Sequence, residues 1–256
     1  KCNENMEIRM DVIKINNIEI KVLDLIWFIM IPIINVNYIL ASFLTKKGHD
    51  ITVALDKVIP FKAIFIIPYV YWYVYIVIGF VFILINSRRD YMRLFISFFI
   101  GMSVCYAIYY VYPTEITRPI IQKGDLLNNL VNFIYSADKP VNCFPSLHVL
   151  TTYFIMRYTK YKNSKKKFYY TQIIGLLIIL STLFIKQHFV LDVIGGILLA
   201  EITILVVKKI NDSKIEKMLD LPYKIKSIFE RKFKLNSNIK NKGIIESEKQ
   251  LIRNKK

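Results

Sequence analysis

The sequence predicts an all-α, polytopic membrane protein built as a six-transmembrane helical bundle. Two observations support this prediction. Of the 256 residues, 54% are hydrophobic and the mean hydropathy is +0.38, which is more apolar than soluble domains usually are. The chain also contains repeated apolar runs close to the ~20 residues that a helix needs to cross a membrane.

Six apolar runs are candidates for the spans. In chain order they are Val22–Leu44, Ala63–Ile85, Leu94–Tyr112, Ser146–Tyr158, Phe168–Gln187 and Phe189–Val207. The fourth run has the length of a buried or re-entrant segment rather than of a full span. It extends to Tyr161 if the Arg157 side chain reaches along the helix to the membrane surface. We therefore expect residues 22–207 to form one six-span membrane domain.

The positive charge alternates along the chain. Most of the 36 Lys and Arg residues lie in residues 1–21, 86–93, 157–167 and 208–256. An even number of spans puts these segments on one side, and the positive-inside rule makes that side the cytoplasm. A net charge of +17 could suggest a nucleic-acid binder, but its distribution along the chain indicates a cell-membrane protein with both termini cytoplasmic. The apolar spans exclude a soluble nucleic-acid binder.

The basic cytoplasmic tail, residues 208–256, has two interpretations. Apolar residues recur in it at roughly helical spacing: Ile215, Met218, Leu219, Ile225, Ile228 and Phe229. A basic amphipathic helix lying on anionic lipid would show this pattern. A partly disordered tail without a role is the alternative.

Polar residues gather at three junctions that this topology puts on the outer face. They are Arg118-Pro119, Pro145-Ser146-Leu147-His148 and His188-Phe189-Val190-Leu191-Asp192. The chain has three histidines, and two of them are at these junctions. Ionisable groups within a span are costly, so they favour a functional site.

Each junction suggests one part of a phosphate site. His188 and Asp192 are spaced i, i+4, so the carboxylate can orient the imidazole as a nucleophile or base. Pro145 suits the first helical turn, where the following N–H groups and the Ser146 hydroxyl can bind an anion. The planar, positively charged guanidinium of Arg118 can donate two parallel hydrogen bonds to phosphoryl oxygens. Taken singly, each junction also has a purely structural interpretation. His188 and Asp192 could be a polar pair that satisfies its own hydrogen bonds, Ser146 a helix cap, and Arg118 an anchor to lipid headgroups.

Together, R-P, P-S-x-H and H-x-x-x-D in this order resemble the type-2 phosphatidic acid phosphatase superfamily over about residues 90–207. The resemblance implies that His188 attacks phosphorus to give a phosphohistidine and that Asp192 orients it. It further implies that His148 protonates the leaving group, and that Arg118 and Ser146 hold the phosphoryl oxygens.

Three positions depart from the family pattern. Val111 and Thr182 stand where the family usually has a lysine and an arginine, and Leu147 replaces a glycine. The S-L-H form resembles the branch that contains inositol phosphorylceramide synthases. Lys186 is the nearby cation that we expect to contact phosphate in place of the two missing ones. A lysine extending to the membrane surface from the end of a span is the alternative.

The expected function is that of a metal-independent membrane phosphatase acting on lipid or isoprenoid phosphate esters. The alternatives are an inositolphosphotransferase-like enzyme that moves a phospho-headgroup to an alcohol, and a non-catalytic phospholipid-binding protein or transporter. We expect no cofactor and no metal, because the outer carboxylates form no D-x-D or D-x-x-D cluster. The expected partners are a membrane-embedded phosphate ester and membrane lipids, and the sequence leaves the oligomeric state open.

Three further features lead to structural expectations. Cys2, Cys105 and Cys143 lie far apart without a C-x-x-C pair, so the sequence indicates neither a zinc site nor a disulfide framework. Gly195-Gly196 should let the last span approach a neighbour closely. Residues 124–136 could form a short interfacial helix over the site.

Overall fold

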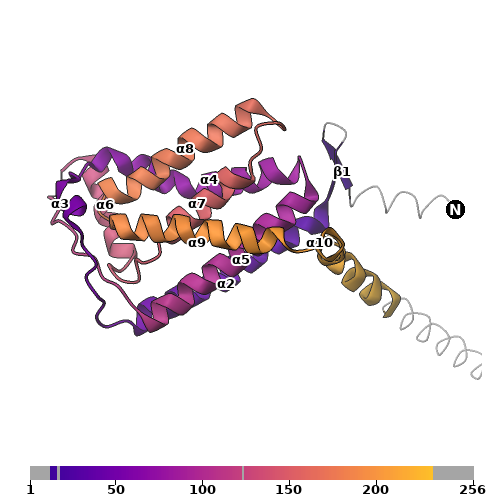
Figure 1. The fold of residues 1–256 in the computed structure, drawn as a ribbon, viewed down its shortest axis with the longest axis horizontal. Coiled ribbons are helices and arrows are strands. Elements are labelled where there is room, and N and C mark those ends of the chain that lie inside the picture. The colour runs from indigo at the N-terminus through magenta and orange to yellow at the C-terminus, as the bar shows by residue number, and fades with distance from the viewer. Residues whose placement is uncertain (1–11, 16–17, 123, 233–256) are drawn as a thin grey trace, which may run out of the picture.

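The computed structural model describes residues 12–15, 18–122 and 124–232 (Figure 1). The elements are, in chain order, β1 (Val12–Ile15), β2 (Ile18–Lys21), the 3₁₀ helix η1 (Val22–Ile29), α2 (Met30–Leu44), α3 (Ala54–Val58), the 3₁₀ helix η2 (Ala63–Phe65), α4 (Ile66–Leu84), α5 (Arg88–Val111), α6 (Leu126–Ala137), α7 (Leu147–Tyr158), α8 (Lys165–Phe184), α9 (Val190–Lys208) and α10 (Asp212–Leu219). The all-α prediction is confirmed, with a small antiparallel β1–β2 hairpin added before the first helix.

Five helices of the described chain are long and apolar enough to cross a membrane. They are Leu23–Leu44, Ala63–Leu84, Arg88–Val111, Lys165–Phe184 and Val190–Lys208. These helices correspond to five of the six expected runs, and they mark the chain as an integral membrane protein. The remaining run became α7, whose 12 residues give a helix about 18 Å long. That length is well short of a ~30 Å hydrocarbon core.

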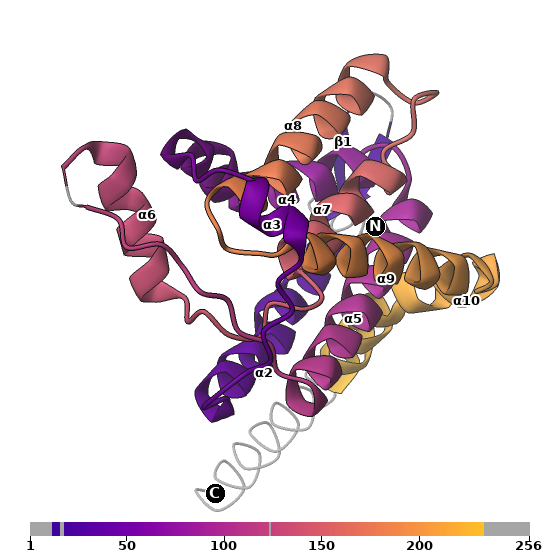
Figure 2. The ribbon, with the colours of Figure 1, turned by 60° about the vertical axis from the view of Figure 1, so that its left-hand side comes forward.

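Helix α7 is the central helix of the bundle. It packs against α4, α5, α8 and α9 (Figure 2). Val149, Leu150, Phe154 and Ile155 are completely buried in this packing. A helix enclosed by neighbours on several sides carries apolar residues all round rather than on one stripe, which explains why this short run resembles a membrane span in the sequence.

Polar caps fix where several helices begin. The side chain of Ser87 accepts a hydrogen bond from the third residue of α5, Ser164 does so at α8, and Asp125 caps α6 in the same way. Such caps satisfy N–H groups that have no partner within the helix. Helix α6 confirms the short helix expected near residues 124–136, and it lies at the edge of the bundle against η2 and α4.

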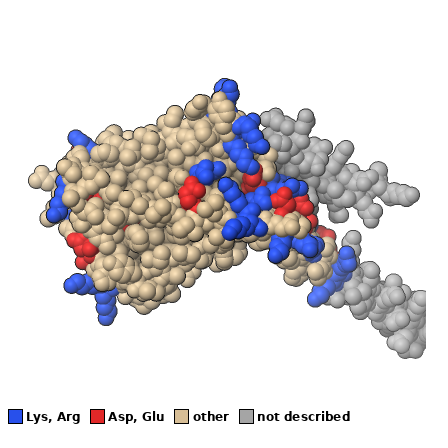
Figure 3. Space-filling view, viewed as in Figure 1, with Lys and Arg blue, Asp and Glu red and all other residues tan. Residues whose placement is uncertain are grey.

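Ion pairs hold the first part of the tail to the bundle. Arg89 pairs with Glu216 at 2.5 Å and Arg93 with Asp212 at 2.5 Å, which joins α10 to the start of α5. Ile215 and Leu219 of α10 are buried. Residues 221–232 are also helical, whereas residues 233–256 of the predicted tail lie outside the described residues. Lys and Arg side chains gather around α10, at the opposite end from α3 and α6 (Figure 3).

The two adjacent glycines allow the start of α9 to lie against the segment before α7. A Cβ atom on Gly196 would lie 3.0 Å from the Ser146 carbonyl oxygen, and one on Gly195 would lie 2.5 Å from the Phe144 ring. The expected close approach of the last span is therefore confirmed, and it brings the P-S-L-H segment against the H-x-x-x-D segment.

Candidate active site

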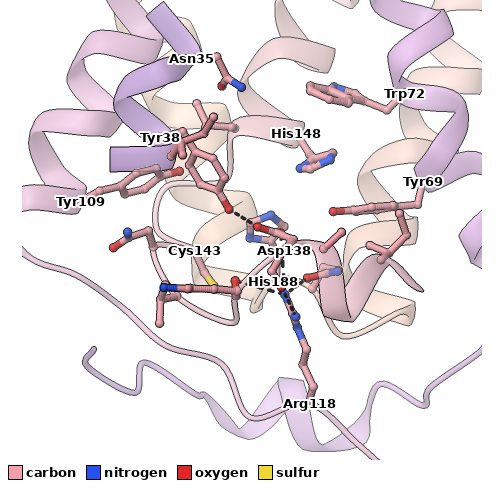
Figure 4. A pocket seen from close by; sticks show the side chains of 18 of the residues that line it. Asn35, Tyr38, Tyr69, Trp72, Tyr109, Arg118, Asp138, Cys143, His148 and His188 are labelled. Atoms are coloured by element: carbon pink, nitrogen blue, oxygen red, sulfur yellow. Dashed lines mark hydrogen bonds and ion pairs between the residues drawn. The ribbon is translucent and has the colours of Figure 1, made fainter. Parts of the chain in front are cut away.

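One cavity of about 310 Å³ lies at the α3 and α6 end of the bundle. Its walls come from α2, α4, α5, α6 and α7 and from the loops before α7 and α9 (Figure 4). The residues that line it are Asn35, Tyr38, Ile39, Tyr69, Trp72, Tyr73, Tyr109, Arg118, Ile134, Ala137, Asp138, Lys139, Val141, Asn142, Cys143, Leu147, His148, Gln187 and His188.

The structure brings three of the six predicted site residues to this cavity. Arg118, His148 and His188 all line it, although 70 residues of chain separate the first from the last. The two imidazole rings have centroids 5.9 Å apart. This separation is small enough for both rings to contact one small group.

His188 is oriented as the i, i+4 spacing predicts. Its Nδ1 lies 3.2 Å from Oδ2 of Asp192, and the same oxygen accepts the Phe189 N–H at 2.8 Å. Asp192 is fully buried, so the carboxylate orients the ring without contacting the cavity. The other ring nitrogen, Nε2, has no hydrogen-bond partner within the described chain, which makes it available to a ligand.

The backbone of the α8–α9 connection positions this histidine. The N–H groups of Gln187 and His188 both donate to the Thr182 carbonyl oxygen, at 3.0 and 3.1 Å. Thr182, at the position where the family usually has an arginine, is fully buried, and its hydroxyl donates to the Ile179 carbonyl at 2.8 Å. Thr182 therefore holds the turn before the histidine, and its side chain carries no charge.

His148 lies deep in an aromatic environment. Its ring stacks on Tyr69 with centroids 4.5 Å apart and lies 4.3 Å from the Trp72 ring. Nε2 of His148 is buried and has no hydrogen-bond partner among the described residues. Because a buried unpaired nitrogen is costly, this atom indicates a place where a ligand atom can bind.

The start of α7 differs in detail from the expectation. Pro145 precedes the helix and does not lie in its first turn, and Ser146 is the cap: its Oγ accepts the Val149 N–H at 3.3 Å. The Ser146 N–H donates to the Asp192 carbonyl at 3.1 Å, so this residue joins the starts of α7 and α9. Ser146 is fully buried and does not line the cavity. The next two N–H groups, of Leu147 and His148, belong to residues that do line it.

The Arg118 guanidinium holds the end of α6. Nη1 donates to the carbonyls of Tyr135 at 3.1 Å and Asp138 at 2.7 Å, and Nη2 donates to Oε1 of Gln187. A cation at a helix C-terminus is stabilised by the helix dipole. Its Nε is buried and has no partner within the described chain, which leaves one directed donor for a ligand.

Lys186 has a different position from the one predicted. Its Nζ donates to the carbonyls of Asp56 at 2.9 Å and Ile59 at 2.5 Å, and the residue does not line the cavity. Its backbone has φ of 53°, which directs the side chain toward α3. Burial lowers the pKa of its amine below the usual value. The second cation in the cavity wall is Lys139.

Several cavity residues were not predicted from the sequence. Asp138 accepts a hydrogen bond from the Tyr38 hydroxyl and lies 3.9 Å from Arg118, and Gln187 binds Arg118 directly. No motif marked these three positions. Tyr69 and Trp72 carried a weak signal, because their i, i+3 spacing puts both rings on one face of a span.

A group of possible metal ligands also meets here. Cys143, His188 and Asp192 each offer one ligand atom, and these atoms lie within 4.8 Å of one another. Burial raises the pKa of the Cys143 thiol well above its usual value, and the Asp192 charge adds to this effect. Because 45 residues separate Cys143 from His188, no short ligand spacing in the sequence indicated the group.

The fold and the site together define a class: a polytopic membrane protein with an internal cavity that presents two imidazoles and a guanidinium. A family model described as the PAP2 superfamily matches residues 49–206. The chain therefore belongs to the PAP2 superfamily, and this membership suggests phosphatase-type activity on phosphate esters. No curated protein and no solved structure matches the chain.

Proposed function

We propose that the protein is a metal-independent membrane phosphatase that hydrolyses lipid or isoprenoid phosphate esters through a phosphohistidine at His188. One observation carries the proposal. Arg118, His148 and His188 come from three distant segments and line a single cavity, with His188 held by Asp192. Two imidazoles and a guanidinium can supply the nucleophile, the general acid and the charge stabilisation for phosphoryl transfer without a metal.

The first step forms a bond between Nε2 of His188 and phosphorus while the ester P–O bond breaks. Asp192 stabilises the imidazolium that results, because its carboxylate accepts the hydrogen bond from Nδ1. His148 donates its proton to the departing alkoxide. The 5.9 Å between the two rings agrees with a phosphoryl group between them, since reacting atoms must approach to about 3–3.5 Å.

The second step releases phosphate. His148, now neutral, takes a proton from a water molecule, and the water oxygen attacks phosphorus as the N–P bond to His188 breaks. An alcohol in place of water would give transfer instead of hydrolysis, as the S-L-H resemblance suggests. The two reactions therefore differ only in the acceptor that enters the cavity.

Three donors are proposed to hold the phosphoryl oxygens. Nε of Arg118 has no partner within the described chain, and the N–H groups of Leu147 and His148 lie at the start of α7, where the helix dipole favours an anion. Ser146 supports this arrangement as the cap of α7. Lys139 adds positive charge to the wall.

The substrate is proposed to reach the site from the membrane, with its headgroup at the outer face. Ile39 of α2 and Tyr73 of α4 line the cavity and are 64% and 60% exposed. Apolar surface at the cavity mouth favours a lipid tail. The positive-inside rule supports a cytoplasmic location for the α10 end of a cell-membrane protein. We propose that α7 and its flanking segments complete a sixth passage through the membrane, which puts both termini on the cytoplasmic side.

The test uses the full chain in detergent micelles containing EDTA. Phosphate release is measured from phosphatidic acid, an isoprenyl phosphate and soluble glycerol phosphate, with and without added alcohols. We expect release from the lipid substrates, a covalent phosphoenzyme, and loss of both in His188→Ala. The matched control is His49→Ala, because His49 stacks on Tyr112 outside the cavity lining.

Three results would count against the proposal. Full activity in His188→Ala would refute the nucleophile. Binding of lipid phosphates without phosphate release or transfer would favour a phospholipid-binding protein or transporter. A preference for glycerol phosphate would refute the membrane-embedded substrate.

A further inference from the structure

We propose that Cys143, His188 and Asp192 form a binding site for a soft divalent cation, Zn²⁺ above all, and that an ion bound there stops the reaction. The inhibitory effect rests on the proposed function, whereas the binding site does not. The three residues come from the loop before α7 and from the start of α9, which the two glycines bring together.

The ligand geometry is close to that of a zinc site. The three ligand atoms lie within 4.8 Å of one another, and the sulfur of Cys143 lies near His188 in the cavity view (Figure 4). Bond lengths of about 2.0–2.3 Å around tetrahedral Zn²⁺ put the ligands roughly 3.3–3.6 Å apart. Binding of the ion would therefore draw the three ligand atoms closer together.

An unpaired buried oxygen independently indicates a missing ligand. Oδ2 of Asp192 is used by Phe189 and His188, but Oδ1 is buried and has no hydrogen-bond partner among the described residues. Asp192 is fully buried, so this oxygen cannot reach bulk water. A cation beside Oδ1 would satisfy it and leave the bond from the Phe189 N–H to Oδ2 in place.

The donor set selects the metal. A thiolate, an imidazole and a carboxylate suit Zn²⁺, whereas Mg²⁺ and Ca²⁺ require sites made of oxygen ligands. On binding, the Cys143 thiol loses its proton to solvent as the S–Zn bond forms. The thiolate and the carboxylate together neutralise the charge of the ion. Cys143 and His188 line the cavity, so a fourth position can be taken by water.

Inhibition follows from the shared histidine. An ion bound to His188 either occupies Nε2 or replaces the contact between Nδ1 and Asp192. In both cases the lone pair on Nε2 that attacks phosphorus in the first step is lost. The two roles exclude each other, so substrate and Zn²⁺ compete.

Binding is tested first, and without any activity measurement. The full chain in detergent is titrated with Zn²⁺ against a chromophoric chelator, and Co²⁺ is used as a spectroscopic probe of thiolate ligation. The variant is Cys143→Ala. The matched control is Cys105→Ala, because Cys105 is also a buried free cysteine but lies on α5, outside the cavity lining.

We expect the wild type and Cys105→Ala to bind Zn²⁺ alike, and Cys143→Ala to bind it at least tenfold more weakly. Equal affinity in Cys143→Ala would overturn the site. If that variant fails to fold, the Co²⁺ spectrum of the wild type decides, since absence of a thiolate-to-cobalt absorption band would refute ligation by Cys143.

Activity is then compared with and without Zn²⁺, each variant relative to its own EDTA-treated rate. We expect Zn²⁺ to inhibit the wild type and Cys105→Ala reversibly, and to require at least tenfold more metal for Cys143→Ala. Activation by Zn²⁺ would overturn the inhibitory role. A wild type without any phosphate release or transfer in EDTA would refute the proposed function, while the zinc titration would still decide the site.

Discussion

Replacing Asp192 with Asn tests how the carboxylate acts on His188. The carboxylate oxygen Oδ2 accepts from the Phe189 N–H at 2.8 Å and lies 3.2 Å from Nδ1 of His188. An asparagine in the same position has one acceptor oxygen and one amide that only donates. Because Oδ2 serves both groups, an asparagine oxygen in that position keeps both hydrogen bonds but has no negative charge, and its amide takes the buried position of Oδ1.

The expected magnitude follows from this loss of charge. The variant keeps the hydrogen bond to Nδ1 but loses the negative charge that stabilises the imidazolium. The same exchange in a serine protease triad, where it also changes the tautomer of the histidine, lowers kcat about 10⁴-fold. We expect a smaller fall in kcat here, about 10²–10³-fold, equivalent to about 2.7–4 kcal/mol of transition-state stabilisation.

The matched control is Asp56→Asn. Asp56 is also a buried aspartate, but it lies in α3 and contacts the start of α9 from there: its Oδ1 accepts the Val190 N–H at 2.8 Å and its Oδ2 accepts the Val53 N–H at 2.9 Å. It binds backbone groups and no histidine. We expect this variant to lose about 1–2 kcal/mol of stability and to change kcat by no more than a few-fold.

The assay is phosphate release from lipid phosphate micelles, with thermal unfolding and size-exclusion profiles as folding controls. Equal kcat losses in the two variants, or a fall below tenfold in Asp192→Asn, would refute the orienting role. Asp192 would then act only as a capping residue of α9.

Three further substitutions probe the surroundings of the reactive histidine. Arg118→Lys should lower kcat/KM about 10²–10³-fold, because a lysine ammonium lacks the fixed, planar N–H donors of the guanidinium. An unchanged kcat/KM for phosphate release would refute phosphate binding by this residue. Gly196→Ala puts a Cβ 3.0 Å from the Ser146 carbonyl oxygen. We expect about 1–3 kcal/mol of destabilisation and a 10–100-fold loss of kcat. A variant with wild-type Tm and kcat would show that the contact between the two segments is not tight. Lys186→Met should lower Tm, because it removes two hydrogen bonds to backbone carbonyls near α3. We expect KM to stay within threefold of wild type. A tenfold rise in KM at unchanged Tm would instead support direct contact with phosphate.

Much of the architecture can be predicted from the sequence because spans are local features. A run of about 20 apolar residues must form a helix in hydrocarbon, since its backbone groups have no other partner there. Five expected runs became such helices. The short run at residues 146–158 was harder to interpret, because a helix buried by protein and a helix facing lipid are both apolar all round.

The motif residues were predicted to converge, and the structure brings Arg118, His148 and His188 to one cavity. Their chemical roles remain predictions. The i, i+4 relation of His188 and Asp192 could be derived from helix geometry alone, and the contact is present.

The sequence by itself determined the helices, the charge asymmetry and the i, i+4 pair, because these depend on neighbours a few residues apart. Only the tertiary structure decided the remaining features of the site. Lys186 turns away at a positive φ, Arg118 binds the end of α6, and Cys143 meets His188 and Asp192 across a contact between two helix starts. These contacts join segments distant in the chain, and their geometry is set by how closely whole helices pack.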